Sequence, residues 1–239
     1  MIKKILGFAV VFAILPTAVL AQWAPLEKGL AYRSSNFSSS SDDQQIHLLR
    51  IDPSRFRVDV LLGKDFGTPI LTAQRYREKS GAIAAINGGF FDEFHHSMGL
   101  LHRNGKTLNP LRNNSWGVFV IEGKHPKIIA RKDWNPAGVL TALQVGPRLV
   151  VDGKVLGFKE TLPARRSAVG ITQDGQVVIA VSEKPIYLKE WAEFLKQDCV
   201  QALNLDGGGS TQLSVATPKI KITIEGETAV PNVVAVFRK

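Results

Sequence analysis

The first stretch that could carry chemistry runs from Asp206 to Thr211 and follows the short apolar run Ala202–Leu205. It contains three consecutive glycines, which have no side chains to pack and lose much backbone entropy on folding. Such glycines let backbone N–H groups approach a ligand closely, here beside a carboxylate and two hydroxyl groups. We interpret Asp206 as a candidate catalytic group. The residues interpreted as a binding turn for an anion are Gly207, Gly208, Gly209, Ser210 and Thr211.

The same stretch has a simpler interpretation as a glycine-rich turn between two strands, with Asp206 capping its own amides. The familiar phosphate loops do not fit it. No Gly-Lys-Ser/Thr ending is present, the G-x-G-x-x-G spacing is absent, and no helix pattern follows the glycines. A nucleotide or dinucleotide site is therefore not supported, and the anion-binding turn and the plain turn stay open.

A second stretch, Asn87 to Asp92, has the same order of an apolar run, a polar side chain and glycines. We expect Asn87 and Asp92 to act in the chemistry, with Gly88 and Gly89 binding substrate in a cleft shared with Asp206. By itself the stretch could also be an ordinary Asn-Gly turn followed by core phenylalanines. His95 and His96 follow closely, but their spacing from Asp92 matches no standard zinc motif, which favours loop residues.

A third candidate is the pair Arg165-Arg166, which precedes the apolar strand pattern Ala168–Thr172. Adjacent side chains in a strand point to opposite faces, so one arginine can enter a site while the other is solvated. A guanidinium group is a natural partner for phosphate. We assign the phosphate to Arg166, and the alternative is a charged start of an edge strand.

The composition and the N-terminal residues restrict the class of protein to which the chain can belong. Residues 1–21 combine Lys3 and Lys4, an apolar run and a small-residue site ending at Ala21, which is typical of a cleaved signal peptide. The expected mature chain has 28 basic and 21 acidic residues, a formal charge of +7. We expect an exported protein, periplasmic or extracellular, with no stable membrane anchor after cleavage. It should be drawn to phosphorylated or anionic glycans.

No basic, aromatic-interleaved helix supports nucleic-acid binding. The single Cys199 excludes an internal disulfide, and its position between a helix pattern and a strand pattern favours a buried, inert thiol. The oligomeric state is not predicted.

The elements that must position these residues are mostly hairpins. Residues 22–45 are expected to be a mobile N-terminal segment, and 46–239 a single domain. Ile46 to Asp52 and Phe56 to Leu62 are predicted to pair through Pro53-Ser54. Further hairpins are expected at Trp116–Ile121 with Lys127–Ala130, Arg148–Val151 with Val155-Leu156, and Ala168–Thr172 with Gln176–Ser182.

Two helices are expected. The first is capped at Thr68-Pro69 and ends at Gly81, and the second spans Leu188 to Gln197. Each leads into a strand, Ala82–Ile86 or Val200–Leu205, that ends at a glycine motif. We expect Ile86 and Leu205 to lie in one sheet. Late strands are expected at Leu213–Val215, Ile220–Ile224 and Val233–Phe237. The fold class is therefore α+β, a mixed and largely antiparallel sheet system with two main helices.

The three motifs together resemble the phosphodiester glycosidase family. The resemblance rests on Asn87–Phe91, Arg166–Gly170 and Asn204–Ser210, and runs in the family's order from about Ile46 to Phe237. The Asp-Gly-Gly-Gly-Ser block is the specific part. The family typically has Thr after the arginine, where this chain has Ser167, which keeps the hydroxyl group.

The resemblance implies hydrolysis of a sugar-1-phosphodiester at the anomeric carbon, in an exported or cell-surface glycan such as an exopolysaccharide. Asp206 is then the first candidate for base or nucleophile and Asp92 the second, while Asn87 orients substrate or water. The alternative is a non-catalytic protein that binds anionic exopolysaccharide or cell-wall glycan in the same cleft. No cofactor is required, although a divalent cation at Asp92 and Asp206 is a third possibility.

Overall fold

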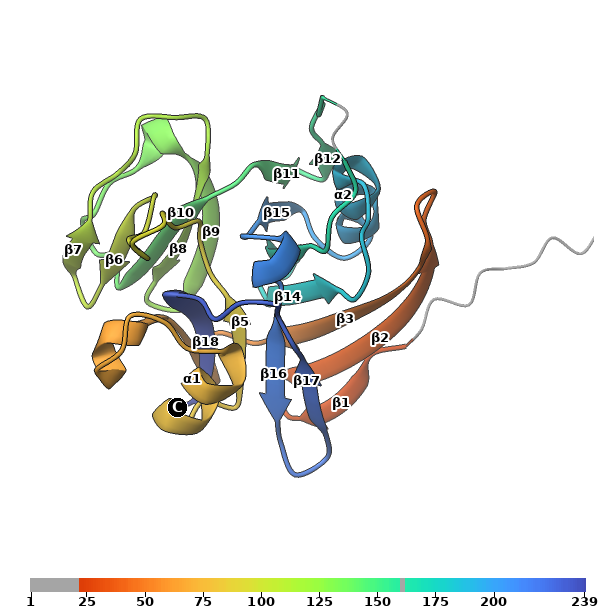
Figure 1. Ribbon diagram of the computed structural model, residues 1–239, viewed down its shortest axis with the longest axis horizontal. Coiled ribbons are helices and arrows are strands. Elements are labelled where there is room, and N and C mark those ends of the chain that lie inside the picture. Colours follow the sequence, from red (N-terminus) through yellow and green to blue (C-terminus); the bar gives the residue numbers. More distant parts are fainter. Residues whose placement is uncertain (1–21, 160–161) are drawn as a thin grey trace, which may run out of the picture.

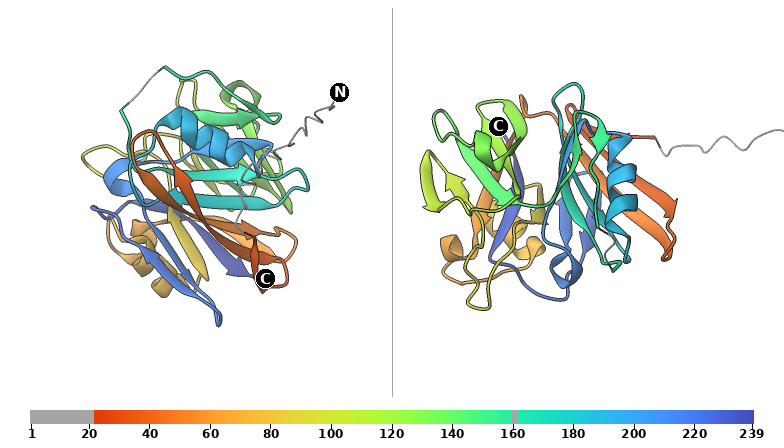
Figure 2. Two further views of the ribbon diagram at one scale, coloured as in Figure 1. Left: turned by 90° about the vertical axis from the view of Figure 1, so that its right-hand side faces the viewer. Right: turned by 90° about the horizontal axis from the view of Figure 1, so that it is seen from above.

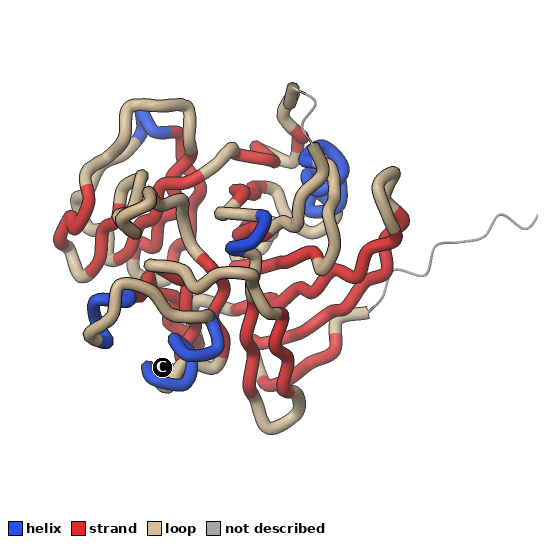
Figure 3. Tube along the Cα trace, in the orientation of Figure 1, coloured by secondary structure: helices blue, strands red, loops and turns tan. Residues whose placement is uncertain are grey.

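The computed structural model describes residues 22–159 and 162–239, and its dominant elements are strands (Figures 1 and 3). Every strand pairing in this described part is antiparallel. Two α-helices accompany the strands. The predicted α+β class, with a largely antiparallel sheet system and two main helices, is confirmed.

The strands form three sheets. The eight-stranded sheet has the order β1 (Ala24–Glu27), β2 (Leu30–Ser38), β3 (Asp43–Ile51), β14 (Val177–Ser182), β13 (Ser167–Ile171), β15 (Gln201–Asn204), β11 (Arg148–Val151), β12 (Lys154–Val155). The β18 sheet has the order β17 (Lys221–Ile224), β16 (Leu213–Ala216), β5 (Ala84–Asn87), β18 (Asn232–Arg238), β4 (Phe56–Leu62). The β10 sheet has the order β7 (Lys106–Asn109), β6 (Leu101–Arg103), β10 (Thr141–Val145), β8 (Gly117–Glu122), β9 (His125–Ala130).

The three sheets share one apolar core. Ile179 of β14, Phe119 of β8 and Val234 of β18 are fully buried members of a single cluster, so each sheet contributes to the same interior. Helix α2 (Leu188–Lys196) packs its apolar side chains on the opposite face of the eight-stranded sheet. Helix α1 (Ala73–Ser80) covers the outer face of the β18 sheet (Figure 2). The three sheets therefore form the common core, and the two helices pack outside it.

The first helix begins later than the sequence predicts. Its N-cap is Thr72, whose hydroxyl group accepts a hydrogen bond from Arg75 N at 3.3 Å, and not Thr68. The backbone of Leu71 is instead paired with Val230, through bonds of 3.1 and 2.9 Å. A residue held in this extended bridge cannot join a helix. The predicted end at Gly81 is confirmed, with a left-handed φ of 73°.

Two expectations for the first third of the chain are wrong. Residues 22–45, expected to be a mobile segment, contain β1, β2 and the start of β3, and β2 pairs with β3 along its whole length. The hairpin expected across Pro53-Ser54 does not form, although both strands exist. β3 pairs with β2 and β14, whereas β4 pairs with β18 in another sheet. The alternating pattern identifies a strand but not its partner.

The other three predicted hairpins are confirmed: β8 with β9, β11 with β12, and β13 with β14. At the β11–β12 turn both Asp152 and Gly153 have positive φ, of 50° and 72°. This is the turn geometry that an Asp-Gly pair favours. Three strands of the β10 sheet, β6, β7 and β10, are not among the predicted elements.

Cys199 is buried, as expected, and burial raises the pKa of its thiol to about 12. A thiol with so high a pKa is uncharged at neutral pH and is a poor nucleophile. The predicted signal peptide, residues 1–21, lies outside the described residues. Within the described part, no helix is both long enough and apolar enough to cross a membrane.

Candidate active site

Asn87, the last residue of β5, is the point where the three sequence motifs meet. Its side chain is fully buried. The amide nitrogen Nδ2 donates to the backbone oxygen of Asp206 at 2.7 Å, and Oδ1 accepts from Ser167 Oγ at 2.6 Å and from Gln212 N at 3.1 Å. These bonds leave Asn87 no exposed group for substrate or water. It therefore holds the motifs in place.

The two glycine motifs also touch directly, since Asp206 N donates to the backbone oxygen of Gly88 at 3.0 Å. Their predicted convergence is confirmed, but the expectation that Ile86 and Leu205 share one sheet is wrong. Ile86 lies on β5 in the β18 sheet, whereas Leu205 follows β15 of the eight-stranded sheet. The motifs meet because two different sheets bring their strand ends together.

Asp206 is half-buried within this junction. Burial raises the pKa of its carboxyl group, while hydrogen bonds from the Ser210 hydroxyl group and from Gly207 N act in the opposite direction. The Gly207 bond to Oδ1 is 2.9 Å long. Among the described residues no basic side chain forms an ion pair with this carboxylate, so its partners there are hydrogen-bond donors. Such a group is a candidate for acid–base or nucleophilic chemistry.

Two of the three glycine amides after Asp206 are engaged within the protein, which differs from the predicted anion-binding turn. Gly207 N donates to Asp206, and Gly208 N donates to the backbone oxygen of Arg165 at 2.8 Å. A Cβ atom on Gly207 would lie 2.8 Å from that same oxygen. Glycine is therefore needed at position 207 for close backbone packing.

Close packing also explains the glycines at positions 88 and 89. Their amides donate to the backbone oxygen and to Oδ1 of Asn232, at 3.0 and 2.7 Å. A Cβ atom on Gly88 would lie 2.0 Å from Asn232 Oδ1, a distance that no side chain tolerates. Asn232, the buried first residue of β18, was missed because nothing in its own sequence neighbourhood marks it.

Ser210, Thr211 and Gln212 complete the turn. Ser210 and Thr211 are buried, and the hydroxyl group of Thr211 has no hydrogen-bond partner within the described chain. Gln212, also missed from the sequence, accepts from Ala73 N at 2.6 Å and donates to the backbone oxygens of Ser210 and Thr228. This amide ties the start of α1 to the turn.

The two arginines flank Gly207 and have different partners. Arg165 donates from Nη2 to the backbone oxygen of Glu225 at 2.9 Å. Arg166 donates to the backbone oxygens of Ile186 and Leu162, both at 3.3 Å. Burial lowers the pKa of Arg166, and no carboxylate among the described residues forms an ion pair with it. Arg166 is a half-buried cation without an anionic partner in the described chain.

Glu227 is the carboxylate that the fold brings to the glycine turn and that the sequence did not reveal. Its backbone N donates to Gly209 O at 2.8 Å. A Cβ atom on Gly209 would lie 3.1 Å from Glu227 Oε2, so the carboxylate is next to that glycine. Glu227 lies between β17 and β18 and is exposed to solvent.

Asp92, the second predicted carboxylate, is used to shape its own loop. Its Oδ1 accepts from Phe94 N and His96 N, at 3.0 and 2.8 Å, and Oδ2 lies 3.3 Å from His96 Nδ1. The bond from the backbone of His96 is the main reason that its pKa is lowered. In the described ranges, no group of three or more His, Cys, Asp or Glu side chains is arranged to hold a metal ion.

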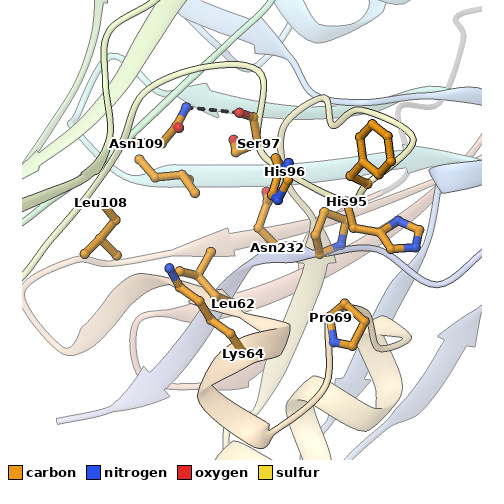
Figure 4. Close-up of a pocket in the computed structure, with 12 residues that line it drawn as sticks. Leu62, Lys64, Pro69, His95, His96, Ser97, Leu108, Asn109 and Asn232 are labelled. Atoms are coloured by element: carbon orange, nitrogen blue, oxygen red, sulfur yellow. Dashed lines mark hydrogen bonds between the residues drawn. The ribbon is translucent and has the colours of Figure 1, made fainter.

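A pocket of about 300 Å³ opens beside the loop formed by Asp92 to His96 (Figure 4). Asn232 lines the pocket, and the same side chain accepts the bond from Gly89 N. Asp206 is not part of the lining. The pocket therefore adjoins the junction of the glycine motifs without containing the candidate carboxylate.

The fold and these motifs define a member of a known class. Residues 80–237 match the model of the phosphodiester glycosidase family, and the chain belongs to that family. The match spans all three motifs, from the last residue of α1 to the next-to-last residue of β18.

Among named relatives, the chain is similar to bovine N-acetylglucosamine-1-phosphodiester alpha-N-acetylglucosaminidase. The two are 29% identical over 169 residues, which cover 58% of this chain and 32% of the bovine protein. The aligned part is thus about a third of that relative's length.

Two solved structures share the fold. The catalytic domain of the zebrafish N-acetylglucosamine-1-phosphodiester alpha-N-acetylglucosaminidase, auto-inhibited by its pro-peptide, has a TM-score of 0.70 and 17% identity, covering 92% of this chain and 88% of that one. A hypothetical protein from Synechocystis has a TM-score of 0.65 and 16% identity, covering 93% of this chain and 64% of that one.

Proposed function

We propose that this protein hydrolyses a sugar-1-phosphodiester at the anomeric carbon, releasing free sugar and a phosphomonoester. The observation that carries the proposal is the junction at Asn87, where Gly207 donates to the half-buried Asp206 carboxylate and a Cβ atom on Gly207 would lie 4.0 Å from Cδ of Arg166, which has no ion-pair partner among the described residues. Family membership and the name of the bovine relative support the same bond type.

The residue types suit this reaction. The bond between the anomeric carbon and the phosphate oxygen breaks, a water oxygen bonds to that carbon, and the water gives up one proton. The transition state resembles an oxocarbenium ion, which a nearby carboxylate stabilises. The leaving group is a phosphomonoester with a second pKa of about 6, so it departs as an anion without a strong general acid.

Within this proposal, Asp206 acts as base or nucleophile and Arg166 binds the departing phosphate. Glu227 is the second candidate for base or nucleophile, the role that the sequence predicted for Asp92. Asp92 remains a third candidate, acting through the loop that it holds. Asn87, Gly88, Gly89, Gly207 and Gly208 act as positioning residues, because their polar groups are bonded to protein atoms.

We place the substrate outside the cytoplasm, in a phosphorylated or anionic glycan such as an exopolysaccharide. The signal-peptide pattern of residues 1–21 and the basic composition support this setting. Protein recovered from the periplasm or medium should begin at Gln22, and an intact Met1 would contradict export.

The proposal is tested by incubating the mature protein with sugar-1-phosphodiesters and following the products by phosphorus NMR. We expect the phosphodiester signal to be replaced by a phosphomonoester signal as free sugar appears. Binding of the glycan without any conversion would instead identify the non-catalytic binding protein.

Arg166→Ala should weaken substrate binding and turnover together. A hydrogen bond to a charged group contributes about 1.5–3 kcal/mol, which corresponds to a loss of about 10- to 150-fold in kcat/KM. Arg165→Ala is the matched control and should change kcat/KM by less than about twofold, since its side chain bonds only to Glu225 O in the described structure. Equal losses in two folded variants would remove the assignment of the phosphate to Arg166.

Glu227→Gln should lower kcat at least about a hundredfold, the low end for a positioned acid or base. Its melting temperature should stay unchanged, because the side chain is exposed and its backbone bond to Gly209 is retained. Glu225→Gln is the control, an exposed glutamate two residues away. If Glu227→Gln keeps a normal rate, Glu227 has no part in the chemistry, and Asp92→Asn becomes the next variant to measure.

A further inference from the structure

The pocket beside the Asp92–His96 loop is built from four separated segments (Figure 4). Lys64 comes from the turn after β4, His95 and His96 from the loop, Asn109 from the end of β7, and Asn232 from the start of β18. Its volume of about 300 Å³ lies at the lower end of the range for small-molecule sites. One sugar-sized group is the scale of ligand that it suits.

Apolar side chains form part of the wall and are unusually exposed. Phe94 is 70% exposed and Leu108 is 39% exposed, and both line the pocket. They are two of the four large hydrophobic side chains that are exposed in the described part of the chain. Covering such surfaces removes apolar area from water, and the C–H face of a sugar ring can do this while its hydroxyl groups stay hydrated.

The polar lining carries a cation and has no carboxylate. It includes Lys64, His95 and His96 but neither aspartate nor glutamate. Lys64 forms no ion pair with a described residue, and the nearby Asp65 is paired with Arg103. His95 Nδ1 is buried without a hydrogen-bond partner in the described chain. Lys64 is exposed and is therefore the side chain of the lining that an anionic ligand would pair with.

The pocket is joined to the glycine turn by a short chain of hydrogen bonds. Asn232 lines the pocket and its backbone oxygen accepts from Gly88 N, while Gly88 O accepts from Asp206 N at 3.0 Å. The Asn232 wall of the pocket and the backbone of Asp206 are thus separated by one residue, Gly88, a distance that successive repeats of one glycan strand can span. The formal charge of the expected mature chain, +7, favours a strand that carries negative charge in each repeat.

We propose that this pocket binds a second phosphate-bearing sugar of the same strand, with its phosphate at Lys64 and its ring against Phe94 and Leu108. The inference rests on the proposed function and narrows its substrate class. The preferred substrate is then a chain of sugar-1-phosphate repeats, in place of a single sugar-1-phosphodiester.

Binding can be measured separately from hydrolysis, by calorimetry on protein carrying Asp206→Asn. The probes are synthetic chains of one and of three hexose-1-phosphate units, each closed as a methyl phosphodiester so that both contain the bond that the proposed reaction breaks. We expect the three-unit chain to bind with a Kd about tenfold lower than that of the one-unit chain. A tenfold difference in Kd corresponds to about 1.4 kcal/mol of additional binding free energy. Adding Lys64→Gln should weaken binding of the three-unit chain by most of that factor, and Leu108→Asp, which puts a negative charge on the wall, should weaken it further.

Lys196→Gln, at the exposed end of α2, is the matched control and should change neither affinity. Equal affinity for the two chains, or an affinity for the three-unit chain that survives both pocket variants, would overturn the inference. Failure of the wild-type protein to hydrolyse either chain would contradict the proposed function, while the calorimetry would still decide whether the pocket binds the strand.

Discussion

Asp206→Asn is expected to lower the rate of phosphodiester hydrolysis at least about a hundredfold while the protein stays folded. The substitution keeps the size of the side chain and the oxygen that accepts from Gly207 N, but it removes the negative charge. A turn that needs only an acceptor would tolerate this change, since a hydrogen bond contributes about 1 kcal/mol net. A carboxylate that faces an oxocarbenium-like centre would not.

The melting temperature shows whether the Asp206→Asn protein is folded when its hydrolysis rate is measured. Burial raises the pKa of Asp206, which means that its ionised form is less favourable in the folded protein than in the unfolded chain. The folded state therefore binds the proton more tightly, and stability falls as the pH rises from the usual aspartate pKa of about 3.9 through the raised value. Asparagine has no charge to bury, so the variant should melt at the same temperature or higher at pH 7.

The pH dependence of activity gives an independent measurement. If ionised Asp206 is the base or nucleophile, the acidic limb of kcat/KM should lie above the pH expected for an ordinary aspartate, because its pKa is raised. A limb at or below that pH would contradict the role. Near-normal hydrolysis by folded Asp206→Asn would move the catalytic assignment to Glu227.

Asn87→Ala is expected to have the largest effect on stability. The variant loses three hydrogen bonds and leaves the partners at Asp206, Ser167 and Gln212 unsatisfied in a buried place. Each unsatisfied buried group costs about 1–3 kcal/mol, so the free energy of unfolding should fall by at least about 3 kcal/mol. For a domain of this size that corresponds to a melting temperature lower by about 10 °C.

Asn113→Ala is a suitable control, because Asn113 is an exposed asparagine in a loop. An exposed side chain of this kind contributes within about 0.5 kcal/mol, so its melting temperature should stay within about 1–2 °C of the wild type. A similar result for Asn87→Ala would show that Asn87 is not needed to hold the motifs together. Hydrolysis should fall in Asn87→Ala even below its melting transition, since Asp206 would lose the bond to its backbone oxygen.

The local features of the fold were predictable from the sequence. The Asp-Gly turn at Asp152-Gly153 and the one at Asp174-Gly175 set their hairpins, because few residues accept the backbone angles that such turns need. Gly81 marked the end of α1 for the same reason. The two glycine motifs marked the junction of the site, since runs of ordered glycines need close backbone approach to justify their loss of entropy.

The tertiary structure decided which strands became partners and which polar groups stayed free. β3 and β4 follow each other in the chain but pair with other strands in two sheets, a choice that depends on packing across the whole core. The amides of Gly88 and Gly207 were assigned to substrate from the sequence, yet Asn232 and Asp206 accept their bonds. Glu227 entered the site only through its contact with Gly209, because hydrogen bonds and close approaches between segments far apart in sequence leave no local pattern.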